Sequence, residues 1–263
     1  MKKNIKVIFK NSIIFILVIL IFSLSGCGGN VRDSDTLKDI KGRAILRIGV
    51  YGDVPGFSEL TDEGFVGFEA ELAKIIGAYI TEDAYPVELV LVSELSRTHA
   101  LTGDKVDLCI SQFTSAVTSS SYAASQPYFT DTYAFLVKSG SYSVVEDLAG
   151  KRVGAIYGQG VKSAVTNLSN KNNLGFEVAD VPSYPEAADM LLHGRLDALC
   201  AQQSLLQRYA ADGLELLPSG FGESSYYIVS HKNKKELITL ADEKLKEMTE
   251  NGRLDALKEK YGL

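Results

Sequence analysis

Apolar runs and helical patterns of apolar residues alternate along most of this chain. Residues 44–50 alternate between apolar and polar positions and predict a strand. A helical pattern follows, with one apolar face made by Phe68, Leu72, Ile75, Ile76 and Tyr79. Two further apolar runs, 87–92 and 106–111, predict strands. Alternation of strands and helices in this way predicts parallel α/β sheets.

The same order of elements restarts at Lys151. Strands are predicted at 152–156, 176–181 and 198–201, and helices at 161–168 and 185–192. About 220 residues therefore divide into two α/β units, and a lobe of roughly 100 residues is large enough to have its own core.

A short motif occurs once in each half of the chain. Residues 101–109 (LTGDKVDLC) resemble residues 192–200 (LHGRLDALC). In each copy the glycine ends a helix, and an aspartate, Asp107 or Asp197, follows a turn before a buried strand. A common helix-to-strand turn used twice explains the motif equally well, and it also predicts two similar lobes.

Two extended stretches, 133–138 and 226–231, flank the second half and predict crossovers between the lobes. Lobe 1 is then predicted to combine 44–135 with 226–263, and lobe 2 to cover 136–225. Open α/β sheets bind ligands beyond the carboxyl ends of their strands. Two such lobes facing each other predict a ligand cleft that closes by a hinge.

The N-terminus carries an export signal. Four lysines precede an uncharged apolar run from Ile13 to Phe22, and Leu24-Ser-Gly-Cys27 follows. The run is shorter than the roughly 20 residues that a membrane-spanning helix needs. Leu-Ser-Gly-Cys resembles a bacterial lipobox, so we expect cleavage of residues 1–26, lipidation of Cys27 and a flexible tether over 27–43 outside the cytoplasmic membrane. A buried N-terminal helix with a chance cysteine is the alternative.

Removal of the signal leaves a strongly acidic chain. The signal carries four of the 27 basic residues and none of the 33 acids, so 23 basic residues face 33 acidic ones, a net charge of −10. This balance argues against nucleic acid or an anionic membrane surface as a partner. Cys109 and Cys200 lie in apolar runs and are predicted to be buried free thiols, with a disulfide as the alternative.

The residue types favour no metal or cofactor chemistry. The three histidines, His99, His193 and His231, have no metal-ligand spacing, and no nucleophile elbow occurs. The glycine-rich turn 158–163 differs from the dinucleotide motif at its third position, where Ser163 stands. We therefore expect no metal, no cofactor and no enzyme activity; a dehydratase-type enzyme, with Glu69 as its cleft carboxylate, is the remote alternative.

A series of ordered motifs resembles one known family. The motifs are 46–50 (LRIGV), 53–57 (DVPGF), 67–73 (GFEAELA), 125–129 (SQPYF), 147–154 (DLAGKRVG) and 194–198 (GRLDA). Together they resemble the extracellular solute-binding proteins of family 3. The glutamate/aspartate type shares the Asp-Val-Pro start and an arginine where Arg97 stands. The resemblance implies a periplasmic-binding-protein type II fold, a monomer, and delivery of an amino acid or related small polar solute to an ABC permease.

The chain departs from the pattern of this family at its charged ligand contacts. Thr118 or Ser119 replaces the arginine that clamps a ligand carboxylate, and Gln202 replaces the aspartate that binds the ammonium group. Because an unpaired buried charge is costly, we expect a neutral polar ligand, or one that binds through Arg97. An amino acid bound differently, or a sensing or interaction lipoprotein that has lost amino-acid binding, are the alternatives.

The resemblance and the helix termini together predict a ligand site. Its residues are Phe57, Arg97, Thr114, Ser115, Ser119, Gln159, Gly160 and Gln202. Phe57 would form an aromatic floor or be a core residue, and Arg97 would clamp a carboxylate or be a solvated residue at a helix start. Thr114 and Ser115 would donate to the ligand or cap a helix. Glu69 would meet a ligand cation or complement a helix dipole.

Overall fold

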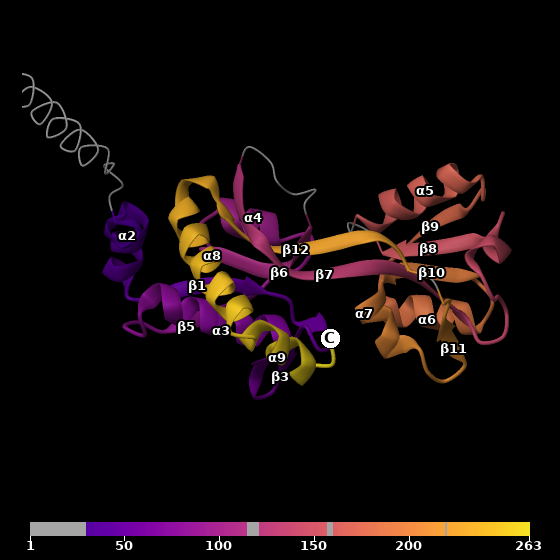
Figure 1. The fold of residues 1–263 in the computed structure, drawn as a ribbon, viewed down its shortest axis with the longest axis horizontal. Helices are drawn as coiled ribbons and strands as arrows, with labels where there is room; N and C mark the ends of the chain where they lie inside the picture. The colour runs from indigo at the N-terminus through magenta and orange to yellow at the C-terminus, as the bar shows by residue number, and fades with distance from the viewer. Residues whose placement is uncertain (1–29, 115–120, 157–159, 219) are drawn as a thin grey trace, which may run out of the picture.

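The computed structural model describes residues 30–114, 121–156, 160–218 and 220–263. Within them, one mixed sheet has the strand order β5-β1-β6-β12-β7-β10-β8-β9, with β11 paired to β7. Figure 1 shows two lobes joined by two long strands, β7 (Tyr122–Lys138) and β12 (Phe221–His231). The fold is therefore two α/β lobes on either side of a two-stranded hinge, as the sequence predicts.

Lobe 1 surrounds the parallel strands β1, β5 and β6. Its strands are β1 (Leu46–Val50), β2 (Asp53–Val54), β3 (Ser58–Thr61), β4 (Gly64–Val66), β5 (Val87–Leu91) and β6 (Leu108–Thr114). Its helices are η1 (Val31–Asp33), α2 (Asp35–Arg43), α3 (Phe68–Thr81), α4 (Arg97–Thr102), η5 (Lys232–Lys234), α8 (Lys235–Glu250) and α9 (Arg253–Lys260). Strands β2, β3 and β4 form a separate small antiparallel sheet that the apolar pattern does not predict.

Lobe 2 repeats the arrangement with strands β8, β9 and β10. Its strands are β8 (Arg152–Ile156), β9 (Glu177–Val181), β10 (Ala198–Gln202) and β11 (Leu214–Leu216). Its helices are η3 (Val145–Leu148), α5 (Val161–Asn172), α6 (Tyr184–Leu192), α7 (Gln203–Leu206) and η4 (Gln207–Tyr209). Strand β8 pairs in parallel with both β9 and β10, which confirms the predicted parallel α/β unit.

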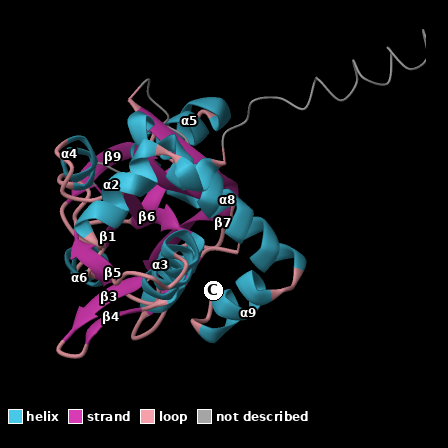
Figure 2. Ribbon diagram, turned by 90° about the vertical axis from the view of Figure 1, so that its left-hand side faces the viewer, coloured by secondary structure: helices cyan, strands magenta, loops and turns pink. Residues whose placement is uncertain are grey.

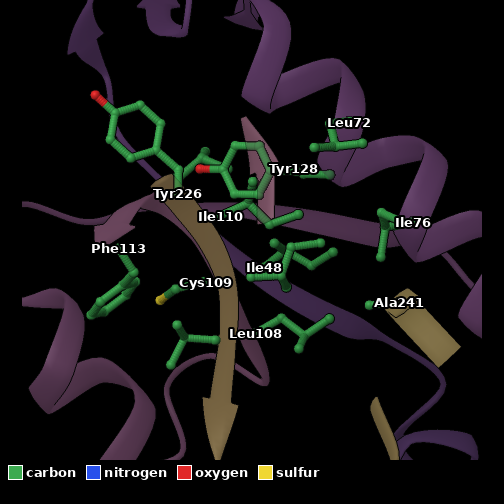
Figure 3. Close-up of a cluster of buried hydrophobic side chains, with 14 of the residues drawn as sticks. Ile48, Leu72, Ile76, Leu108, Cys109, Ile110, Phe113, Tyr128, Tyr226 and Ala241 are labelled. Carbon is green, nitrogen blue, oxygen red and sulfur yellow. The ribbon is translucent and has the colours of Figure 1, made fainter. Parts of the chain in front are cut away.

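The core of lobe 1 packs helices against both faces of its sheet. In Figure 3, Ile48 of β1 and Leu108 of β6 lie side by side, on the face that α3 and α8 cover. Cys109 of β6 points to the opposite face, where its thiol lies against the Arg97 carbonyl of α4. Cys109 is buried here and Cys200 is buried in lobe 2, and both thiols are free, as the sequence predicts. Burial raises the pKa of the Cys109 thiol to about 12.

The hinge strands belong to both cores. Phe129 of β7 packs in the core of lobe 1, whereas Tyr133, Ala134 and Phe135 of the same strand pack in lobe 2. The chain therefore crosses before Tyr133 and not at the predicted boundary after residue 135. A continuous strand has no break in its apolar pattern at such a crossing, so the sequence contains no signal for it.

The predicted tether is too long. Residues 35–43 form helix α2, whose Ser34 side chain caps the helix by accepting from the Leu37 N–H. Ile40 is buried against lobe 1, and the Arg43 guanidinium lies 2.7 Å from the Asp107 carboxylate. The charge partner lies 64 residues away, so no local pattern predicts this docking. Cys27 and the predicted signal lie outside the described residues, and within the described ones no helix has the length and apolarity needed to cross a membrane.

Candidate functional site

The carboxyl end of β6 meets the first residue of α4 in lobe 1. Arg97 begins α4 and is only 5% exposed. Its guanidinium donates to the Ser111 carbonyl and lies 2.5 Å from the Glu94 carboxylate. The guanidinium carbon stands 4.0 Å from the centroid of the Phe113 ring and 5.6 Å from that of Tyr51. Arg97 is therefore a paired, stacked cation, and Glu94 lies where a ligand carboxylate would bind it.

Glu69 lies in the first turn of α3 and is fully buried. The Tyr128 hydroxyl and the Gln112 N–H, the latter at 3.0 Å, both donate to its Oε1 atom. Burial raises the pKa of Glu69 to about 8, although these hydrogen bonds oppose the shift. With this pKa the protonated form of Glu69 predominates at pH 7, and its carboxyl is hydrogen-bonded to Gln112 of β6. It neither meets a ligand cation nor complements the helix dipole as an exposed carboxylate.

Gln112 is a residue of this region that the sequence analysis does not single out. Its backbone adopts a φ of 52°, in the left-handed region, and its side chain is 7% exposed. Within the described residues, neither the Gln112 Nε2 atom nor the Glu69 Oε2 atom has a hydrogen-bond partner. The available signal was a polar pair, Ser111-Gln112, inside a run that is otherwise apolar. Thr114 ends the same strand, half-buried and paired with Tyr226 of β12.

Lobe 2 contributes the end of β10 and the start of α5. Gln202 ends β10, is 3% exposed and pairs in register with Tyr133 of β7. Gly160 precedes the first turn of α5, and a Cβ atom there would lie 3.9 Å from the Tyr133 hydroxyl. Tyr133, which the sequence analysis did not select, therefore lies close to both predicted residues. The first turn of α5 adds backbone N–H groups that can serve an anionic or carbonyl ligand atom.

Phe57 is a core residue in this structure. It is fully buried, and its ring centroid lies 5.2 Å from that of Phe129, 5.9 Å from that of Tyr226 and 6.2 Å from that of Phe68. The turn after β2 places Phe57 over the start of α3, where its carbonyl accepts from the Glu69 N–H at 2.7 Å. Phe57 is therefore a core residue, which is the second of the two alternatives, and its contacts are with the aromatic residues of lobe 1.

The predicted residues thus form two groups, one in each lobe. Arg97 and Thr114 lie in lobe 1, and Gly160 and Gln202 lie in lobe 2, with the hinge strands between them. Three further candidates, Ser115, Ser119 and Gln159, lie outside the described residues. Among the residues that the structure describes, no cluster of His, Cys, Asp or Glu side chains could hold a metal ion.

The lobes also touch directly on the side of α7. Leu205 of α7 packs into the core of lobe 1. Arg208, two residues after α7, donates to the Tyr261 carbonyl at 3.0 Å across the lobe boundary. The Arg208 guanidinium rests against Gly56, where even a Cβ atom would overlap it. Contacts of Leu205 and Arg208 therefore connect lobe 2 to lobe 1 on one side of the hinge.

Known proteins resemble the chain over most of its length. It is 27% identical to the L-cystine-binding protein TcyJ of Escherichia coli (strain K12), over 87% of this chain and 86% of TcyJ. It is 26% identical to the arginine-binding extracellular protein ArtP of Bacillus subtilis (strain 168), over 95% of this chain and 96% of ArtP. The crystal structure of an ancestral amino acid-binding protein, AncCDT-1, a precursor of cyclohexadienyl dehydratase, superposes with a TM-score of 0.74 at 25% identity, covering 86% of this chain and 99% of that one.

These similarities agree with the fold and with the motifs along the sequence. The two lobes on a two-stranded hinge are those of type II periplasmic binding proteins. Residues 46–263, which include the strands of both lobes, match the model of one family. The chain belongs to the bacterial extracellular solute-binding proteins, family 3.

Proposed function

We propose that this protein is the substrate-binding lipoprotein of an ABC importer and captures a small polar solute between its lobes. The family and the amino-acid-binding and cystine-binding names of its relatives support capture of an amino acid or a related solute. The observation that supports the proposal is that each lobe holds a buried polar residue, Arg97 in lobe 1 and Gln202 in lobe 2, with the hinge strands between the lobes.

We infer that the ligand presents a neutral polar group to lobe 2. Gln202 is an amide at the position where the family pattern has an ammonium-binding aspartate, and an amide both donates and accepts hydrogen bonds. In lobe 1, Glu94 already neutralises Arg97, and the Gln112 amide is available for a hydrogen bond. An ammonium group buried against these neutral amides would be unpaired and costly. An amino acid bound in another way is the second possibility.

The cleft chemistry favours binding over catalysis. A dehydratase-type enzyme would need an acid or base that reaches the ligand, and Glu69 was the candidate. Its carboxyl is fully buried, and its Oε1 atom accepts from Tyr128 and Gln112, so burial keeps it from a solute. A ligand-sensing lipoprotein would use the same cleft and would differ in its membrane partner.

The predicted lipid anchor and permease complete the proposal. Lipidation at Cys27 would keep a monomeric receptor on the extracytoplasmic face of the cell membrane, beside an ABC permease. Replacement of Cys27 by Ser should release the protein from the membrane fraction. A Cys27→Ser protein that stays membrane-bound would contradict the anchor.

A thermal-shift screen of the mature chain tests the ligand class. A ligand stabilises a protein by RT ln(1 + [L]/Kd), and we expect neutral polar solutes to raise the melting temperature more than glutamate or arginine. Gln202→Asp should restore binding of ammonium-bearing α-amino acids. Gln203→Asp adds the same charge one residue further along and should not. Equal responses of the two variants, or a strong shift of the wild type with an ordinary α-amino acid, would contradict the proposed ligand class.

A further inference from the structure

We propose that the end of lobe 1 that carries α2 is the surface facing the phospholipid bilayer. This inference rests on the proposed lipid anchor at Cys27. In Figure 1, α2 lies at the end of the molecule opposite lobe 2, and Figure 2 looks onto that end with α2 and α8 in view. The segment that follows the anchor is bound to this end and is not a free tether.

Arg32 attaches the start of the described chain to helix α3. Its guanidinium donates to the Tyr79 and Ile80 carbonyls, both at 3.3 Å, and pairs with Glu82 at 3.2 Å. It also stands 5.1 Å from the centroid of the Tyr79 ring. Carbonyls in the last turn of a helix lack partners within the helix, so a cation that donates to them is favoured there. Residue 32 is therefore fixed on lobe 1.

Helix α2 continues this attachment. Ile40 is 1% exposed in the lobe 1 core, and Leu37 packs beside it. Thr36 lies 3.2 Å from Glu236 of α8, and Arg43 pairs with the fully buried Asp107. Because a buried charge without its partner is costly, this end of the segment stays docked. Residues 31–43 are thus part of the body of lobe 1.

The docked segment leaves a very short connection to the lipid. Three Cα–Cα steps separate Cys27 from Asn30, which span at most about 11 Å. A compact domain of this size has a radius of gyration of roughly 17 Å. If all of 27–43 were a free coil, its root-mean-square length would be roughly 23 Å, and either lobe could face the bilayer. The connection between Cys27 and Asn30 is shorter than the radius of the domain. It therefore keeps the end of lobe 1 to which it is attached turned toward the membrane.

The charge of the protein does not supply this orientation. The mature chain carries an excess of acids, so an anionic bilayer does not attract it as a whole. The orientation comes from the anchor and the docked segment. Lobe 1 is then held at the membrane, and hinge closure moves lobe 2 relative to it.

Two fluorophores on the lipidated mature chain, residues 27–263, in phosphatidylcholine vesicles test the orientation. One label replaces Lys38 on α2, whose side chain is 67% exposed, and the other replaces the exposed Lys171 on α5 of lobe 2. The native Cys109 and Cys200 are fully buried and should not react. With a quencher on the lipid headgroups, we expect several-fold stronger quenching at Lys38→Cys than at Lys171→Cys.

Two variants separate the tether from other causes. Eight Gly/Ser residues inserted between Gly29 and Asn30 should make the two labels equally quenched. Arg32→Ala should reduce the difference in quenching between them without abolishing it. Equal quenching in the native sequence, or a difference that survives the insertion, would overturn the orientation. A wild-type protein that never reaches the vesicles, or a Cys27→Ser variant that still does, would instead contradict the anchor.

Discussion

Asp107 and Asp197 occupy equivalent places in the two lobes. Asp107 accepts from the Arg47 N–H at 3.0 Å, and its own N–H donates to the Arg47 carbonyl at 2.8 Å. Asp197 makes the same pair of bonds with Arg152, both at 3.0 Å. The motif repeated in the sequence therefore marks one device used twice, in which an aspartate ties the start of its strand to the start of its neighbour.

The two aspartates differ in their other hydrogen-bond and ion-pair partners. Replacing them should therefore lower the free energy of unfolding by different amounts. Asp107 is fully buried and also pairs with Arg43 and with Lys234 at 3.0 Å, whereas half-buried Asp197 accepts from the Tyr142 hydroxyl at 2.6 Å. Asp107→Asn should lower the free energy of unfolding by about 3 kcal/mol, because the half-buried cations Arg43 and Lys234 lose the buried carboxylate that they share.

Asp197→Asn is the matched comparison and should cost about 1 kcal/mol, the value of a hydrogen bond. Urea unfolding of both variants measures the difference. Equal costs would contradict the role of the buried ion cluster.

Glu69 should make stability depend on pH. Its pKa in the folded protein, about 8, lies above its ordinary value of 4.5, so between these values the folded state keeps a proton that the unfolded state has lost. The stabilisation is complete below pH 4.5 and is lost as pH rises toward 8. Glu69→Gln keeps an uncharged acceptor, so its stability does not depend on this ionisation. In this window its free energy of unfolding should rise relative to that of the wild type by up to about 1.4 kcal/mol per pH unit.

Glu71, two residues further along α3, is the control, because its pKa is shifted in the opposite direction. Partial burial raises its pKa, but hydrogen bonds from Lys260 and Tyr261 outweigh burial and leave the pKa lowered. Glu71→Gln should therefore lose stability above the ordinary pKa and match the wild type as pH falls. Unfolding between about pH 2 and pH 9 measures both variants, because the lowered pKa of Glu71 places its loss of stabilisation below pH 4.5. Parallel pH curves for Glu69→Gln and the wild type would show that the Glu69 carboxyl is charged.

Glu94 should compete with acidic ligands for Arg97. The two side chains lie 2.5 Å apart, so a ligand carboxylate must replace Glu94 to reach the guanidinium. Glu94→Gln should tighten glutamate binding about tenfold, a gain comparable with one charge-assisted hydrogen bond. Arg97→Ala should weaken it. Glu88→Gln removes an exposed charge from β5 of the same lobe and should leave the calorimetric Kd unchanged; the same response in all three would exclude Arg97 from the site.

Gly56 should control the contact between the lobes. Gly56 and Gly140 both have a φ of 74°, but a Cβ atom at Gly56 would overlap Arg208, whereas nothing lies within 4 Å at Gly140. Gly140→Ala should lower the free energy of unfolding by about 1 kcal/mol, from backbone strain alone. Gly56→Ala should cost more and should raise the radius of gyration in solution scattering as Arg208 leaves Tyr261.

In an Arg208→Ala background, Gly56→Ala should lower the free energy of unfolding no more than Gly140→Ala does, because only the backbone strain of the positive φ remains. An undiminished cost in this background would place the effect elsewhere than at Arg208.

The sequence predicted well those elements whose signals are local. Periodicity placed the start of α3 at Phe68 and both ends of β8, and it separated parallel α/β units from extended hinge strands. Missed elements have weak local patterns: α2 buries only one residue fully, and strands β2 and β4 are two and three residues long. The sequence left the role of Phe57 open. An aromatic floor of the ligand site and a core residue would both be an aromatic side chain after the same turn.

Local order, the family and the two-lobed plan were determined by the sequence alone, because they depend on apolar spacing and ordered motifs. The ionisation of Glu69, the partner of Arg97 and the attachment of residues 31–43 were decided only by the tertiary structure. Each depends on burial or on a partner brought close by the fold, such as Tyr128 for Glu69 and Asp107 for Arg43. Spacing along a chain carries no measure of desolvation or of distance in space, and these two quantities set the energy of a buried charge.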